Sequence, residues 1–87
     1  MTYALLIVQG PEVDATEESQ RRWHAFQSAS AQIQLKDERS KRLPPGSWLL
    51  HLRSDLLTLG MLTAQAARHH FPSHTLFFDK EPDLITT

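Results

Sequence analysis

Two segments of the chain are apolar at almost every position: residues 3–8 (YALLIV) and 48–52 (WLLHL). A strand with one wet face alternates apolar and polar side chains, so a continuous apolar run predicts a strand that is covered on both faces. A third run, residues 75–78 (TLFF), is nearly as apolar. The pattern predicts strands at about 3–9, 47–52 and 74–79.

A helical period follows the first of these strands. Trp23 and Phe26 lie on one face of a pattern that predicts a helix over about 15–31, with these two side chains as its core anchors. Asp14 is the expected N-cap, and Glu17 follows it at capping-box spacing.

A second helix is predicted over about 55–70, where apolar side chains cover a wide arc. Ser54 is the expected N-cap, and Pro72 ends the helical pattern. Gly60 lies inside the helix, which suggests close contact with a neighbouring element.

The segment between the first helix and residue 47 admits two interpretations. Residues 32–36 (QIQLK) alternate polar and apolar, which predicts a half-exposed strand. Residues 36–42 are polar and predict a projecting turn, closed by the sequence PPG at 44–46. In the other interpretation, residues 32–42 form a plain loop.

With the strand included, the element order is β-α-β-β-α-β. This order predicts an α+β, ferredoxin-like sandwich, an antiparallel sheet with two helices on one face. We expect the first and third strands at its centre, parallel to each other, and the polar second strand at an edge. We expect one domain over residues 1–79 and a tail over 80–87 that acts as an added or exchanged strand. The alternative is a three-stranded β-α-β-α-β unit.

Two helices cover only one face of such a sheet, so the other face is expected to carry an exposed apolar patch. A patch of several hundred Å² is near the upper end found on monomers, and it predicts association with a second molecule. The C-terminal tail is the alternative cover. The predicted interface residues are Leu5, Ile7, Leu49, His51, Phe77, Leu84 and Ile85.

Composition narrows the classes of function. The chain has 87 residues, a net charge of −1 and no cysteine. The charge gives no strong attraction to nucleic acid or to an anionic membrane. The lack of cysteine excludes disulfides and thiolate zinc sites, and it favours a cytoplasmic location. No apolar stretch approaches the ~20 residues of a membrane span, and the first strand lacks the features of a secretory signal.

Histidines provide the densest group of candidate metal ligands. His70 and His74 have the i, i+4 spacing of a helical metal pair, but Pro72 interrupts the helix between them. We therefore interpret His69 and His70 as helix C-terminal residues, where the helix dipole favours a cation. The sequence predicts no metal site, no cofactor and no catalytic residue.

Four cations within seven residues form the second candidate group: Lys36, Arg39, Lys41 and Arg42. On a projecting turn they are candidate contacts for a phosphate backbone or an acidic protein partner. Asp37 and Glu38 dilute their field, so a solvated turn is the simpler interpretation.

The element order and size resemble two groups of small ferredoxin-like dimeric ribonucleases, the small CRISPR-associated endonuclease and the antitoxin that cleaves its partner's messenger RNA. The resemblance covers nearly the whole chain but involves no specific motif. The endonuclease family carries a metal-binding acidic residue near the end of its first strand, where this chain has Gln9.

Three hypotheses of function follow. The first is a non-enzymatic interaction or regulatory protein that acts through a homo- or hetero-oligomeric sheet surface. The second is an RNA-binding or RNA-cleaving protein that uses the basic segment 36–42. The third is a small-ligand sensor that binds at a dimer seam.

Overall fold

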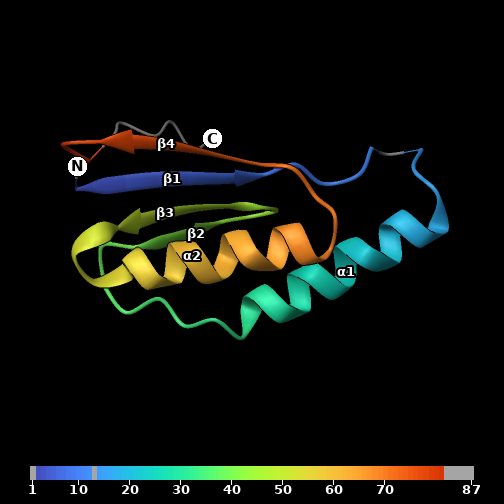
Figure 1. The fold of residues 1–87 in the computed structure, drawn as a ribbon, viewed down its shortest axis with the longest axis horizontal. Helices are drawn as coiled ribbons and strands as arrows, with labels where there is room; N and C mark the ends of the chain where they lie inside the picture. The colour runs from blue at the N-terminus through green and yellow to red at the C-terminus, as the bar shows by residue number, and fades with distance from the viewer. Residues whose placement is uncertain (1, 13, 82–87) are drawn as a thin grey trace.

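Four strands and two helices follow one another in the predicted β-α-β-β-α-β order (Figure 1). The computed structural model describes residues 2–12 and 14–81. Within the described chain, no helix is long and apolar enough to cross a membrane. The elements are β1 (Tyr3–Val8), α1 (Glu17–Ala31), β2 (Lys41–Leu43), β3 (Ser47–His51), α2 (Leu52–Arg68) and β4 (Ser73–Phe78).

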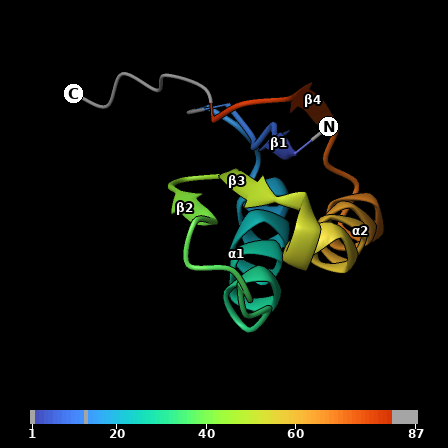
Figure 2. The ribbon, with the colours of Figure 1, turned by 90° about the vertical axis from the view of Figure 1, so that its left-hand side faces the viewer.

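The strands form one four-stranded sheet in the order β2-β3-β1-β4, and every neighbouring pair is antiparallel. Both helices lie against the same face, α1 below β3 and β2 and α2 below β1 and β4 (Figure 2). The predicted ferredoxin-like arrangement is confirmed. The prediction that β1 and β3 are parallel is wrong, because the α1 crossover makes β1 parallel to β2, and β3 runs back between them.

The core lies between the sheet and the two helices. Residues paired directly across an antiparallel ladder share a face, so Leu6 and Trp48 point the same way, as do Ala4 and Leu50. This is the helix-covered face, which includes Val8. Both predicted anchors of α1 pack here, Phe26 completely buried and Trp23 half-buried. The buried core residues are Leu6, Val8, Phe26, Trp48, Leu50, Leu62, Ala66 and Phe71.

Gly46 shows how tightly the β2–β3 turn packs onto α1. A Cβ at this position would lie 2.8 Å from the Trp23 ring and 2.8 Å from the Val8 carbonyl oxygen. The Gly46 carbonyl also accepts a hydrogen bond from the Val8 amide at 2.8 Å. Only glycine allows the turn to approach both elements this closely.

The predicted edge strand over 32–36 is wrong; β2 is Lys41–Leu43, and residues 32–40 form a loop without strand pairing. The alternation there has another cause. Ile33 and Leu35 are half-buried against the core, and Gln34 between them is exposed. Apolar side chains at alternate positions therefore anchor a loop and do not form a ladder.

Both helices begin at residues other than those predicted. Thr16, not Asp14, is the N-cap of α1, and its side chain accepts a hydrogen bond from the Ser19 amide at 3.2 Å. Helix α2 begins directly after β3 with His51 as its N-cap, not Ser54, and it is kinked at Asp55. Leu52, expected in the strand, is its first residue.

Helix α2 ends in a Schellman motif. The amide of Phe71 donates to the Ala66 carbonyl at 2.9 Å, and the amide of His70 donates to the Ala67 carbonyl at 3.1 Å. His70 has φ 64°, in the left-handed region that favours glycine. The motif turns the chain towards β4 without glycine at its usual position.

We predict that His70→Gly stabilises the protein by about 1 kcal/mol, because it removes the Cβ strain of a left-handed residue. Urea unfolding monitored by circular dichroism measures the change. Arg68→Gly, in the last turn of α2, is the matched control and should destabilise by about 1 kcal/mol. A loss of stability in His70→Gly would contradict the prediction.

Candidate functional site

The face of the sheet opposite the helices carries most of the predicted interface. Ladder pairing places Leu5 with Leu49 and Tyr3 with His51 on this open face, and Ile7 follows in the same row of β1. Phe77 pairs with Ala4 and therefore lies on the helix-covered face. The prediction that Phe77 shares a surface with the other interface residues is wrong, because the β4 register places Leu76 there instead.

Leu49 and His51 are on the predicted face but are not exposed. Their exposed fractions are 1% and 3%, so the expectation that they form an open patch is wrong. Lys41 lies beside Leu49 in the ladder, and its ammonium group is 3.7 Å from a carboxylate oxygen of Glu81. Because Lys41 and β4 are at opposite edges, residues 79–81 run from the end of β4 over the open face towards Lys41 (Figure 2). Leu84 and Ile85 lie outside the described residues.

The exposed large apolar side chains gather at the β4 side of the molecule. On the open face Leu76 is 51% exposed and Ile7 is also exposed. On the other face Phe77 is 46% exposed and lines a surface hollow together with Leu56 of α2. The apolar surface is therefore present, but it surrounds an edge strand and does not cover the centre of the sheet.

The structure also contains a buried polar cluster centred on Asp55, which the sequence analysis did not identify. One carboxylate oxygen of Asp55 accepts from the Lys36 amide at 2.9 Å and the Thr58 hydroxyl at 2.8 Å. The other accepts from the Asp37 amide at 3.0 Å and the Ser40 hydroxyl at 2.6 Å. These four donors fill both oxygens, and they attach the 36–40 loop to the start of α2.

A second carboxylate extends the cluster to the open face. Asp37 accepts two hydrogen bonds from the Arg39 side chain, each at 3.0 Å. His51 places Nδ1 3.3 Å from an Asp37 oxygen, within ion-pair distance but without hydrogen-bond geometry. The Tyr3 ring meets the His51 ring edge-on, with centroids 4.9 Å apart. The His51 ring thus has Asp37 and Tyr3 of the same protomer as its neighbours.

The two carboxylates are stabilised in their ionised forms. Hydrogen bonds from the Arg39 side chain hold the pKa of Asp37 well below its usual range, and the same pair raises the pKa of Arg39. Burial alone would raise the pKa of Asp55, but the donors from Ser40, Lys36 and Thr58 outweigh it and lower that pKa. Donors from within the protomer bind both carboxylates, so the chemistry of these two groups is that of a structural clamp.

The sequence contained one signal for this cluster. Asp55 lies in a buried helical stripe with Thr58, Leu62 and Ala66. A carboxylate at a core position of an amphipathic helix requires hydrogen-bond donors from another segment. The donors themselves are mostly backbone amides of a loop, which residue types do not reveal.

Three of the four cations predicted as nucleic-acid contacts have intramolecular partners. Arg39 pairs with Asp37, and Lys41 pairs with Glu81. Arg42 donates to the carbonyls of Ser30, Ala31 and Ile33 at the end of α1. These are the cation contacts expected at the negative end of a helix dipole. The 36–42 segment is packed against the fold, so the prediction that it projects is wrong.

The side chains of the predicted histidine group do not gather around a common point that could hold a metal ion. His69 has Nδ1 2.9 Å from the Gln65 carbonyl oxygen, and His70 occupies the Schellman position. Across residues 2–12 and 14–81, no group of three or more histidine and acidic side chains is arranged to hold a metal ion.

Comparisons of the chain with protein-family models, with curated proteins and with solved structures give no match.

We predict that Asp55→Asn destabilises the protein by on the order of 3 kcal/mol, because the amide NH₂ group would face donors that now meet a carboxylate. Glu18→Gln, an exposed change in the first turn of α1, is the control and should shift stability by less than about 0.5 kcal/mol. Urea unfolding at neutral pH gives both values. Equal effects of the two substitutions would contradict the role of Asp55.

The lowered pKa of Asp55 also predicts a pH dependence. A carboxyl with a lower pKa in the folded state stabilises the fold above its unfolded pKa of ~3.9, and this contribution is lost as the pH falls through the folded value. The stability difference between wild type and Asp55→Asn should shrink steadily below about pH 5. A difference that stays constant to pH 3 would contradict this account.

Proposed function

We propose that this protein is a non-enzymatic interaction module that forms a homodimer through the exposed edge of β4. The observation that carries the proposal is that β4 is an edge strand with exposed apolar side chains on both faces, Leu76 on one and Phe77 on the other. An edge strand of this kind is a template for pairing with another strand.

The contrast between the two edges of the sheet supports this choice. β2, at one edge, has three residues, two of which are the cations Lys41 and Arg42. Short length and positive charge are devices that prevent edge-to-edge pairing. β4, at the other edge, has six residues, SHTLFF, with no Lys, Arg, Asp, Glu or Pro. Only the second edge lacks these protective features.

The hydrogen-bond register shows which groups of β4 face outward. The Gln9 amide donates to the Pro72 carbonyl at 2.9 Å, and in an antiparallel ladder such paired residues alternate. The backbone groups of Ser73, Thr75 and Phe77 therefore point away from β1. Two copies related by a two-fold axis would join these groups in an antiparallel β4–β4 pair and extend the sheet.

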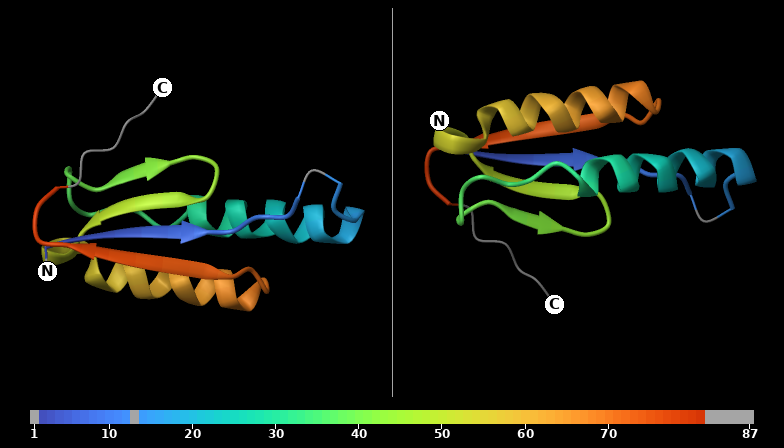
Figure 3. Two further views of the ribbon diagram at one scale, coloured as in Figure 1. Left: turned by 90° about the horizontal axis from the view of Figure 1, so that it is seen from above. Right: turned by 90° about the horizontal axis from the view of Figure 1, so that it is seen from below.

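Side chains beside the edge would add apolar contact area. Helix α2 projects past β4 on the same side of the molecule (Figure 3). Leu56, Leu57 and Met61 are exposed large apolar residues of this helix. In a β4–β4 dimer the two α2 helices would flank each other below the extended sheet, while Ile7 and Leu76 would meet above it. The cysteine-free composition favours a cytoplasmic location for this assembly.

Leu76→Lys should convert the dimer to a monomer, because it places like charges at the centre of the β4–β4 pair. Sedimentation equilibrium measures the mass, and circular dichroism confirms that the variant is folded. His24→Lys, on the exposed side of α1, introduces the same charge elsewhere and should leave the dimer intact.

Thr75→Pro separates edge pairing from general hydrophobic contact. It removes an amide that faces away from β1, a position where an edge strand tolerates proline. We expect a folded monomer. A typical weak dimer has a Kd of about 1 μM, so at a protein concentration of about 0.1 mM, 100 times that Kd, nearly all of the protein is dimeric. A wild-type protein that is monomeric at this concentration would refute the proposed function.

A further inference from the structure

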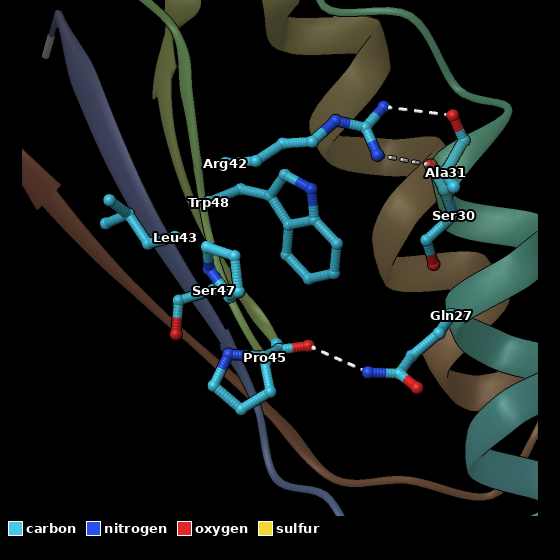
Figure 4. A pocket seen from close by; sticks show the side chains of 10 residues that line it. Gln27, Ser30, Ala31, Arg42, Leu43, Pro45, Ser47 and Trp48 are labelled. Carbon is cyan, nitrogen blue, oxygen red and sulfur yellow. Dashed lines mark hydrogen bonds between the residues drawn. The ribbon is translucent and has the colours of Figure 1, made fainter.

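A small cavity lies at the other side of the molecule, between the end of α1 and the β2–β3 hairpin (Figure 4). Its volume is about 130 Å³. Apolar groups form most of its wall, including the Trp48 ring and the side chains of Leu43, Pro44, Pro45 and Ala31.

Two buried polar atoms in this wall have no hydrogen-bond partner within the described chain: the Trp48 indole Nε1 and the Ser30 hydroxyl oxygen. Both residues are almost completely buried, and both line the cavity. The indole N–H is only a donor, and the hydroxyl is a donor or an acceptor. Buried polar groups in native proteins normally have partners, so both atoms are available to bond to a molecule that enters the cavity.

Arg42 and Gln27, which also line the cavity, are already engaged. Arg42 donates to the Ser30 and Ala31 carbonyls at 3.3 Å each, and Gln27 donates to the Pro45 carbonyl at 3.5 Å (Figure 4). The Arg42 guanidinium therefore binds the carbonyl groups at the end of α1 and is not free to bind a ligand. The cavity offers two donors in an apolar wall and no unpaired charge, which disfavours an ionic ligand because its desolvation is not compensated.

We propose that this cavity binds a flat, uncharged cyclic amide, whose carbonyl oxygen accepts from the Trp48 indole N–H and the Ser30 hydroxyl. The size agrees, because an engineered apolar cavity of about 150 Å³ binds benzene. The cyclic amide adds to such a ring the acceptor that the two orphan atoms require. The proline side chains and the Trp48 ring provide the apolar walls for its faces.

The donors are held in place before any ligand binds. The Trp48 ring meets the buried Phe26 ring edge-on, with centroids 6.0 Å apart. Ser30 is in the last turn of α1. Because both side chains belong to core elements, little ordering is required on binding.

The probe is 2-pyridone, titrated into the full chain labelled with ¹⁵N and followed by the indole N–H resonances of its two tryptophans. A saturable downfield shift of the Trp48 indole N–H at concentrations up to about 10 mM is expected. The Trp23 indole, which does not line this cavity, is the internal control and should not shift. Toluene, a ring without an acceptor, should cause no downfield shift of the Trp48 N–H.

Ser30→Ala should weaken 2-pyridone binding about fivefold, through the loss of one hydrogen bond. Two results would overturn the proposal: no saturable Trp48 shift in the wild type, which would leave the cavity to water alone, or equal binding to Ser30→Ala. The cavity is on the β2 side and the proposed dimer on the β4 side, so Leu76→Lys should bind the probe as wild type does. This test is therefore independent of the dimer.

Discussion

The fold depends on one buried carboxylate. Asp55 is fully buried and accepts four hydrogen bonds, two from backbone amides and two from hydroxyls. An ionised carboxylate in a core is destabilising unless it is hydrogen-bonded, so the loop that supplies three of the four donors is held where they reach Asp55. On that path Asp37 lies 3.3 Å from the His51 ring, and the Ser40 hydroxyl accepts a hydrogen bond from the His51 amide. Strand β2 begins at the next residue, Lys41.

This clamp decides which apolar surface remains available. Because the 36–40 loop contacts His51 and the chain after β4 reaches Lys41, the β2–β3 half of the open face is occupied within the protomer. The exposed apolar groups that remain lie around β4 and along α2. The two sides of the molecule thus differ in character. The β2 side has a charged, short edge and a small cavity, and the β4 side has a longer, uncharged edge.

Much of the fold could be predicted from the sequence because a strand that is buried on both faces is a continuous run of apolar residues. The apolar runs located β1, β3 and β4, and helical spacing located α1 and α2. The second strand was misplaced because residues 32–36 have the alternation of a strand, whereas Asp55 binds the Lys36 and Asp37 amides that a ladder would need. The interface prediction named the open face but could not show that Leu49 is covered, because that depends on long-range contacts. The orphan atoms of Trp48 and Ser30 are equally invisible in sequence, since each residue type alone is ordinary.

The most direct test of the account is amide hydrogen exchange at Lys36, Asp37 and His51, measured by NMR at neutral pH. If Asp55 and Ser40 hold these amides as the structure shows, they exchange as slowly as the central amides of β1, and only through global unfolding. Fast exchange at Lys36 and Asp37, at the rate of an exposed loop, would contradict the central claim that a buried carboxylate fixes this segment.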